Sequence, residues 1–205
     1  MLKIFAAPKS IALASVILLE EIEADYEITM LDFSRNEQRD TAYQAINPKG
    51  RVPALATEDG ILTETPAILL YLAQRFGADS LTGAHSPFVF AQIQEFNSYL
   101  ASTVHVAHAH RLRGSRWTDD PQALEALKTK VPESMAQVVR LIEDELLQGP
   151  WVMGEAYTIC DPYLFTICSW LEDDGVDTTR LPRILAHRQQ ILQRPATQAA
   201  LSQLG

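Results

Sequence analysis

The sequence has few of the features that mark membrane, nucleic-acid-binding and disulfide-stabilised proteins. Its apolar runs all fall short of the ~20 residues that a membrane-spanning helix needs. Its 17 basic residues are outnumbered by 26 acidic ones, and the net charge of −9 argues against nucleic acid or an anionic membrane as a partner. The apolar start Met1–Ala7 is cut short by Pro8-Lys9, so we expect a first strand there and no signal peptide.

Cysteine is also scarce, and its placement excludes a disulfide framework. Cys160 and Cys168 lie in one apolar segment. On a single helix, residues eight apart are separated by two turns or more, which is too far for a disulfide bond. We expect two buried thiols in a reducing cytoplasm.

Hydrophobic residues make up 47% of the chain, which is enough for a sizeable core, and two patterns follow one another along it. Short β-branched segments alternate with helical ones at first, and strand signals vanish after a stretch rich in turn formers. The order βαβα–ββα predicts a small mixed sheet with helices, a thioredoxin-like α/β arrangement. We predict an α/β domain at 1–77, a linker at 78–86 and an all-helical domain at 87–205.

The expected elements can be placed by range. In the first half we expect strands at 2–5 and 26–31, a helix capped by Ser10 and ending near residue 23, a weak helix at 36–45, two strands on either side of a tight turn before Gly60, and a helix at 65–76. In the second half we expect helices at 87–113, 121–147, 161–173, 181–194 and 195–201. Pro132 should kink or interrupt the second of these.

One stretch organises the first half: Asn47–Leu55, followed by Gly60–Thr65. A proline at the first residue of a strand costs no ladder hydrogen bond, so Val52-Pro53 is expected to open a strand. X-Pro bonds are also the common place for a cis peptide. A cis bond here would leave the Val52 N–H and C=O free to pair with an extended peptide ligand. The alternative is an ordinary edge-strand start.

The residues just before the next helix extend this hypothesis. Thr65 is expected to cap the helix, with Pro66 at its first position. Free N–H groups at a helix start attract a carboxylate, and Glu64 could hold an ammonium beside it. Glu64 could equally be a surface acid. Together, the Val52 backbone, the helix start and Glu64 predict a binding site for a small zwitterionic peptide.

Asn-Pro-Lys-Gly-Arg-Val-Pro-Ala-Leu, followed by Leu-Thr-Glu-Thr-Pro-Ala-Ile-Leu-Leu-Tyr-Leu-Ala, is similar to the glutathione-binding half of the cytosolic glutathione transferases, nearest to the bacterial beta-like branch. The resemblance covers essentially the whole chain. It implies the glutathione transferase fold, a homodimer, and an enzyme that joins glutathione to a small hydrophobic electrophile. Glutathione would be a co-substrate, with no metal. The alternatives are a glutathione-binding protein with little transferase activity, or a glutathione-dependent isomerase, dehalogenase or peroxidase, since fold does not choose among these.

The resemblance also assigns roles to residues. The backbone of Val52, turned by Pro53, would pair with the cysteinyl part of glutathione, while Glu64 and Thr65 would hold the γ-glutamyl end. Lys49 or Arg51 would meet the glycyl carboxylate as a charge-assisted contact.

A transferase of this kind must stabilise a thiolate whose free thiol has a pKa of about 8.5. The family takes the donor, a Tyr, Ser or Cys, from the turn after the first strand. Beta-like relatives read Ser-Pro-Gly-Ala-Cys-Ser-Leu, whereas this chain has Ile11 and Ala12 at the Cys and Ser positions. Ser10 is then the local neutral hydroxyl and Lys9 the local cation. Ser10, or its N–H, would face the sulfur; the alternative is a plain helix cap.

A second candidate for contact with the sulfur is His105, which matches a histidine that beta-like enzymes carry in this helix. His105 and His108 are three residues apart and share a face, whereas His110 points elsewhere. An imidazole can donate to a thiolate, although these histidines could instead line the domain interface. A metal is not expected, because no cysteine or carboxylate joins the histidines at helical spacing.

Two further motifs need weighing. Arg111, Arg113 and Arg116 with Trp117 could favour an anionic substrate, but a solvated helix end is the preferred interpretation. Thr158-Ile-Cys-Asp161 precedes an apolar run and is typical of a capping box, which predicts a role in folding.

Overall fold

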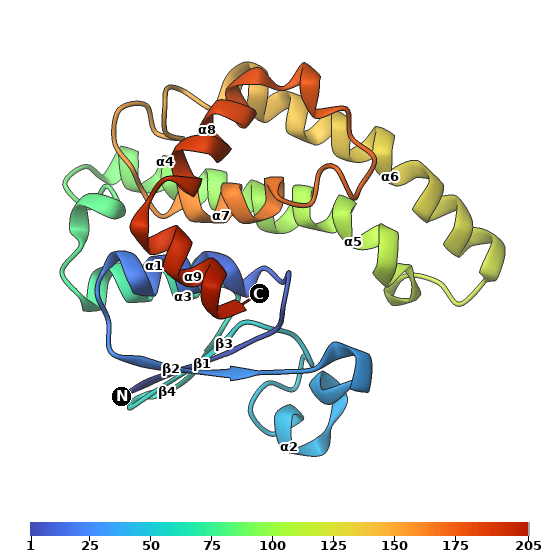
Figure 1. The fold of residues 1–205 in the computed structure, drawn as a ribbon, viewed down its shortest axis with the longest axis horizontal. Helices are drawn as coiled ribbons and strands as arrows, with labels where there is room; N and C mark the ends of the chain where they lie inside the picture. Colours follow the sequence, from blue (N-terminus) through green and yellow to red (C-terminus); the bar gives the residue numbers. More distant parts are fainter. Residues whose placement is uncertain (205) are drawn as a thin grey trace.

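The computed structural model describes residues 1–204 and has an N-terminal half built on a four-stranded sheet (Figure 1). Its elements are, in chain order, β1 (Leu2–Ala6), α1 (Ala12–Glu21), β2 (Tyr26–Met30), 3-10 turns at Phe33–Arg35 and Glu37–Arg39, α2 (Thr41–Gln44), β3 (Ala54–Thr57), β4 (Gly60–Thr63) and α3 (Thr65–Arg75). The strand order is β2-β1-β3-β4. β1 pairs parallel with β2, while β3 runs antiparallel to both β1 and β4. This is the mixed thioredoxin-like sheet that the sequence predicts.

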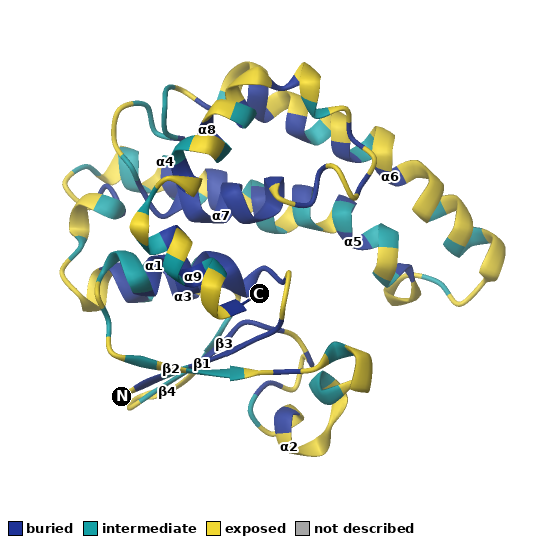
Figure 2. Cartoon of the chain, viewed as in Figure 1, coloured by how far each residue is buried: buried dark blue, intermediate teal, exposed yellow. Residues whose placement is uncertain are grey.

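Helices alone follow after a 3-10 turn at Asp79–Leu81. They are α4 (Pro87–Tyr99), a π-helical turn (Leu100–Val104), α5 (His105–Arg113), a 3-10 turn (Gly114–Arg116), α6 (Pro121–Leu141), a second π-helical turn (Ile142–Leu146), α7 (Cys160–Cys168), a 3-10 turn (Thr178–Arg180), α8 (Pro182–Leu192) and α9 (Pro195–Leu204). α7 is buried along its whole length and forms the centre of this half (Figure 2). No helix among residues 1–204 combines the length and the apolar character that crossing a membrane requires.

The two halves share one core. α1 and α3 lie between the sheet and the helical half, and α9 returns to pack beside α1 (Figure 1). α1 is apolar on nearly all sides, and eight of its ten residues are buried. A helix that is apolar all round belongs in an interior, so α1 works as the layer between the halves.

Several predicted boundaries are wrong. α1 begins at Ala12 and not at Ser10, whose hydroxyl accepts the Ala12 N–H at 3.3 Å from the turn before the helix. Thr65 does not cap α3: Glu64 occupies the cap position with a φ of 73°, and Thr65 is the first helical residue. α6 runs through Pro132 without interruption and gives way to a π-helical turn after Leu141. The sequence pattern does not reveal that the neighbouring turns tolerate the lost hydrogen bond.

The remaining differences are shorter or shifted ranges. The weak helix expected at 36–45 is one 3-10 turn at Glu37–Arg39 and the single α-turn α2, and the strand expected at 26–31 ends at Met30. The helix expected at 161–173 stops at Cys168, and the last two helices span 182–192 and 195–204.

The capping box is present, with Asp161 at its centre. Its carboxylate accepts the backbone N–H of Thr158 at 2.7 Å, and the Thr158 hydroxyl accepts the N–H of Cys160 at 3.3 Å. The other carboxylate oxygen accepts the N–H of Val152 at 2.8 Å and lies 3.0 Å from His187 Nε2. One buried carboxylate therefore joins the loop before α7, the start of α7 and α8.

Candidate functional site

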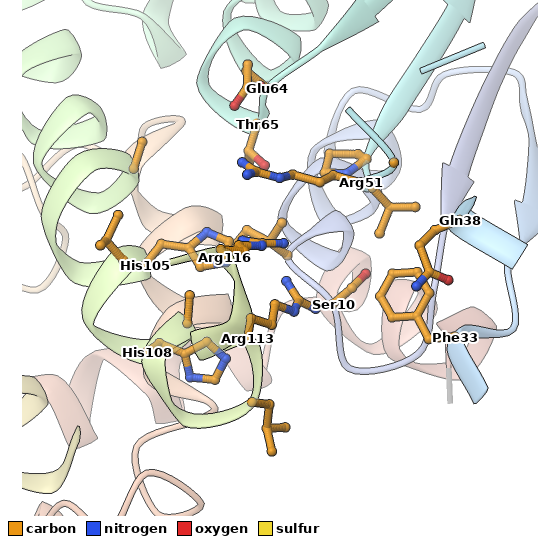
Figure 3. A pocket seen from close by; sticks show the side chains of 18 of the residues that line it. Ser10, Phe33, Gln38, Arg51, Glu64, Thr65, His105, His108, Arg113 and Arg116 are labelled. Atoms are coloured by element: carbon orange, nitrogen blue, oxygen red, sulfur yellow. The ribbon is translucent and has the colours of Figure 1, made fainter. Parts of the chain in front are cut away.

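A cavity of about 610 Å³ opens between the two halves (Figure 3). Its N-terminal wall contains the turn at Lys9–Ile11, the loop around Arg51–Pro53 and the β4–α3 junction at Thr63–Pro66. Its opposite wall comes from α5 and the turn that follows, with Tyr163 and Trp170 behind them. Every residue that the sequence assigns to glutathione or its sulfur lines this cavity except Lys49, which lies beside it.

The loop before Val52 is held by a short hydrogen-bond network that sequence reasoning missed. The carbonyl oxygen of Arg51 accepts from the Tyr43 hydroxyl at 2.6 Å and from the side-chain amide of Asn47 at 2.7 Å. The Asn47 side-chain oxygen accepts the N–H of Lys49 at 3.2 Å. Asn47 is buried, so its amide is an anchor for the loop rather than a surface group.

A close approach explains the glycine of this loop. Gly50 has a φ of 59°, and a Cβ there would lie 2.9 Å from the carbonyl oxygen of Gln38. A side chain at this position would meet both backbone strain and a clash. Gly50 therefore lets the loop pack closely against the 3-10 turn that contains Gln38.

The backbone N–H and C=O of Val52 are not paired with the sheet, as the sequence predicts. The Val52–Pro53 peptide is cis, and β3 begins only at Ala54. Within residues 1–204, the N–H and C=O of Val52 make no hydrogen bond. Val52 lines the cavity, so this polar edge can pair with an extended ligand.

The β4–α3 junction combines a cationic group, an acid and a helix start. Lys49 Nζ lies 2.5 Å from Glu64 Oε1 and donates to the Thr63 hydroxyl at 2.8 Å. Both charged side chains are about half exposed, so the ion pair itself is weak. Thr65 is buried at the first turn of α3, where unpaired N–H groups suit a carboxylate.

Ser10 lies in the turn between β1 and α1, with its hydrogen bonds directed to the backbone. Its hydroxyl donates to the carbonyl oxygen of Ala7 at 2.7 Å, and its backbone N–H donates to the same oxygen at 3.3 Å, so the Ser10 N–H expected at the sulfur is already paired. A hydroxyl has a single proton to donate, so Ser10 must rotate to donate to anything in the cavity. The neighbouring N–H of Ile11 makes no hydrogen bond within residues 1–204. Donation from Ser10 to a sulfur remains a prediction.

His105 follows directly after the π-helical turn of the α4–α5 helix, a type of irregularity that is frequent at functional sites. Its ring lies 5.3 Å from that of Trp170. Burial lowers the pKa of His105 to about 3, and the nearby charges of His108, Arg113, Arg116 and Arg51 act in the same direction. His105 is therefore neutral at physiological pH and can donate one N–H without adding charge.

His108 is more firmly held than sequence reasoning suggests. It stacks on Trp170, with ring centroids 4.2 Å apart, and its Nδ1 lies 2.7 Å from the buried carboxylate of Asp174. Arg111 Nε lies 2.9 Å from the other oxygen of that carboxylate. Asp174 thus neutralises Arg111 and fixes the orientation of the His108 ring. Spacing along α5 does not indicate Asp174, because it lies far along the chain.

The arginines of the cavity are a feature that the preferred interpretation of the sequence missed. Arg113 and Arg116 line it from the helical side and Arg51 from the other side (Figure 3). Arg39 also lines the cavity, from the N-terminal half. Burial is the first cause that lowers the pKa of Arg113 and Arg116, to about 10 for Arg116, and the charge of Arg51 adds to it. The cavity is therefore strongly positive although the protein as a whole is acidic.

A second cavity, of about 670 Å³, adjoins the first. Ser10, Phe33, His108 and Arg113 line both cavities. The rest of its wall has a large apolar part, from Leu13, Phe165, Leu192, Leu201 and Leu204, together with the charged residues Arg111, Asp173 and Arg188. A polar cavity thus meets an apolar one at Ser10. Residues 1–204 contain no group of three or more His, Cys, Asp or Glu side chains arranged to hold a metal ion.

Comparison with known proteins gives relatives over the full length. Residues 1–74 match the family described as the N-terminal domain of glutathione S-transferase. Glutathione S-transferase GstA of Escherichia coli O157:H7 is 31% identical, over 100% of this chain and 99% of its own. A glutathione transferase homologue from Sulfitobacter, solved with bound glutathione, is 43% identical with a TM-score of 0.96, covering 99% of this chain and 98% of its own. A beta-class glutathione S-transferase of Sphingomonas chungbukensis is 29% identical with a TM-score of 0.85, at 99% and 98% coverage.

Proposed function

Because the chain belongs to the cytosolic glutathione S-transferase superfamily, we propose that it binds glutathione in the first cavity and transfers it to an electrophile in the second. Transferase function is that of its full-length relatives. The unpaired backbone edge of Val52 is the observation on which the site assignment rests, because it faces the same cavity as Ser10 and His105. A backbone edge of this kind recognises an extended peptide through main-chain hydrogen bonds.

Each part of glutathione then has a matching group. The cysteinyl backbone pairs with Val52 beside Pro53, and the α-carboxylate of the γ-glutamyl end meets the start of α3 at Thr65. Glu64 takes the ammonium. Arg51 or Lys49 takes the glycyl carboxylate. The sulfur lies near Ser10, at the junction of the two cavities, with Lys9 as the nearest cation of the turn.

Activation of the thiol is electrostatic. A thiolate at the start of α1 is stabilised by the N–H groups there and by the positive field of the cavity. Neutral His105 supplies a further donor from the opposite wall. The thiolate sulfur then forms a bond to the electrophilic atom, the leaving group departs with its electron pair, and the thiol proton passes to water. Holding both reactants in adjoining cavities supplies proximity.

A titration of bound glutathione tests this function. Thiolate absorbance is followed against pH with the enzyme saturated, and S-methylglutathione, which has no thiol, is the matched control. A bound pKa well below the free value of about 8.5 is expected. An unshifted pKa with intact binding would contradict transferase chemistry and would favour a glutathione-binding protein with little activity.

We also propose a cytoplasmic homodimer with domains at 1–77 and 87–205 joined by a linker at 78–86. Phe76 at the end of α3 and Phe88 at the start of α4 are exposed, Phe88 by 72%, which supports a partner packed on that side. Both cysteines are free and buried, which fits a reducing compartment. Analytical ultracentrifugation tests the dimer, and a monomer at micromolar concentration would contradict it.

A further inference from the structure

The positive charge on the helical wall exceeds what glutathione needs. Glutathione has two carboxylates, and the N-terminal wall already offers Arg51, Arg39 and the start of α3 to receive them. Arg113 and Arg116 lie on the opposite wall (Figure 3). Among the described residues 1–204, neither forms an ion pair or a side-chain hydrogen bond with protein. Arg111, two residues earlier, does form such contacts, with Asp173 and Asp174.

The position of Arg113 relates it to the electrophile. It lines both cavities, as Ser10 does, and its guanidinium lies 5.9 Å from the centre of the Phe33 ring across the cleft. Arg113 therefore stands where the two reactants meet. Arg116 lies one turn further on and lines the first cavity beside it.

Guanidinium groups that share a cavity repel one another, and the repulsion grows as water is displaced. An anion placed between Arg113 and Arg116 removes that repulsion and gains charge-assisted hydrogen bonds, for which the planar guanidinium is well suited. Nearby acids do not fill this role. Within the described chain, Glu64 of the first cavity is paired with Lys49, and Asp173 of the second cavity lies 4.0 Å from Arg111.

We propose that Arg113 and Arg116 bind a negatively charged group of the electrophile, such as a carboxylate, while its apolar body occupies the second cavity. The inference rests on the proposed transferase function and deepens it. The co-substrate class is then a small apolar molecule that carries both an electrophilic centre and an anionic group. The family resemblance implies only a small hydrophobic electrophile, and one without a charged group would lack what the arginines bind.

A matched pair of electrophiles tests the proposal: 4-chloro-3-nitrobenzoate and 4-chloro-3-nitrobenzamide. In both, the thiolate sulfur bonds to the ring carbon that bears chlorine, the C–Cl bond breaks, and chloride leaves with its electron pair. Each kcat/KM is divided by the rate of the uncatalysed reaction with glutathione, which removes the difference in ring reactivity. We expect the normalised ratio to favour the benzoate by about ten-fold or more, the usual effect of one charged hydrogen bond.

The variants Arg113→Gln and Arg116→Gln should each lower that ratio toward one while leaving unchanged the affinity for S-methylglutathione, which has no thiol to ionise. Arg113→Lys, which keeps the charge but loses the planar fork, should fall in between. Arg180→Gln is the control, because Arg180 is exposed and lines neither cavity. Quenching of tryptophan fluorescence by the two glutathione conjugates gives a readout independent of turnover, and the carboxylate conjugate should bind more tightly.

The possible outcomes separate this proposal from the transferase function. If both compounds are conjugated with equal normalised rates, the transferase stands and the anion site is wrong. If Arg113→Gln and Arg116→Gln weaken glutathione itself and leave the ratio unchanged, the arginines serve glutathione and the proposal is overturned. If glutathione binds but neither compound reacts, and the two conjugates bind equally, the anion site is wrong whatever the reaction. Failure of glutathione to bind at all would remove both proposals.

Discussion

The two walls of the cavity are built on different principles. The N-terminal wall contributes backbone groups as well as side chains: the Val52 edge, the start of α3 and the turn before α1. The Val52 edge is held by hydrogen bonds within a short stretch of chain. The helical wall presents side chains, chiefly His105, His108, Arg113 and Arg116. Backbone groups suit a ligand that never changes, whereas side chains can be exchanged without altering the fold. The first wall therefore fits the constant co-substrate, and the second fits the variable one.

The helical wall depends most on Asp161, although this residue lies outside the cavity. Asp161 lies at the start of α7, the helix that places Tyr163 in the cavity, and its carboxylate accepts two buried backbone N–H groups and contacts His187 of α8. Asp161→Ala leaves these donors unpaired, and we expect it to lower the free energy of unfolding by about 3 to 5 kcal/mol. Asp161→Asn, which keeps one acceptor oxygen, should cost less. Urea unfolding followed by tryptophan fluorescence measures both; a loss below about 1 kcal/mol for Asp161→Ala would refute the network's importance.

In the N-terminal wall, the loop before Val52 depends most on Asn47. Replacing Asn47 should lower the free energy of unfolding less than Asp161→Ala does, and should weaken glutathione binding more. Asn47→Ala removes the donor to the Arg51 carbonyl and the acceptor for the Lys49 N–H. We expect the free energy of unfolding to fall by about 1 to 2 kcal/mol, and the affinity for glutathione, measured by calorimetry, to fall roughly ten-fold. Tyr43→Phe removes only the second donor to that carbonyl and serves as the matched variant. Unchanged glutathione affinity in Asn47→Ala would show that the loop does not position the Val52 edge.

How well the sequence predicts each wall follows from this contrast. In the N-terminal wall, the Val52 loop and the β4–α3 junction lie in one short string, residues 47–66, so the loop, its cis peptide and its place in the sheet could be predicted. The left-handed backbone of Glu64 could not, because nothing in a non-glycine residue signals a φ of 73°. The helical wall is assembled from positions far apart in the chain. Asp174, which orients His108, is an example that no local pattern could indicate.

The arginines of the helical wall are a second example of a site feature that local sequence could not predict. A run of cations at a helix end is usually solvated, and that general rule favoured a solvated end for Arg113 and Arg116. The fold overrides it for Arg113, which is half-buried, because the turn after α5 brings that end of the helix against the loop that contains Arg51, whereas Arg116 lines the cavity but stays exposed. Tertiary placement, not sequence pattern, decides whether a charged run faces solvent or a ligand.

A titration of His105 tests whether the helical wall desolvates its side chains. Its pKa of about 3 lies below the unfolded value of about 6.5, so the unfolded state binds more protons between these values. Stability is therefore fully present above about pH 6.5 and is lost as the pH falls toward 3. We expect the His105 ring resonances to stay constant from pH 8 to 5 by NMR. His105→Gln should flatten the acid limb of stability, with exposed His85→Gln as the control. A ring that titrates near pH 6 would mean that the helical wall does not desolvate this imidazole.

The smallest effect is expected at Ser10, where the N-terminal wall supplies a side chain as well as backbone. Its hydroxyl proton goes to the Ala7 carbonyl, so the donors nearest a sulfur at this turn are the backbone N–H groups. Ser10→Ala should then raise the pKa of bound glutathione by less than about half a unit, since a direct hydrogen bond to the thiolate would be worth about one to two units. Ser10→Thr keeps the hydroxyl and is the matched variant. A rise of a full unit in Ser10→Ala, absent in Ser10→Thr, would show that the hydroxyl turns to the sulfur when glutathione binds. The N-terminal wall would then use a side chain for chemistry, and the division between a backbone wall and a side-chain wall would hold for recognition alone.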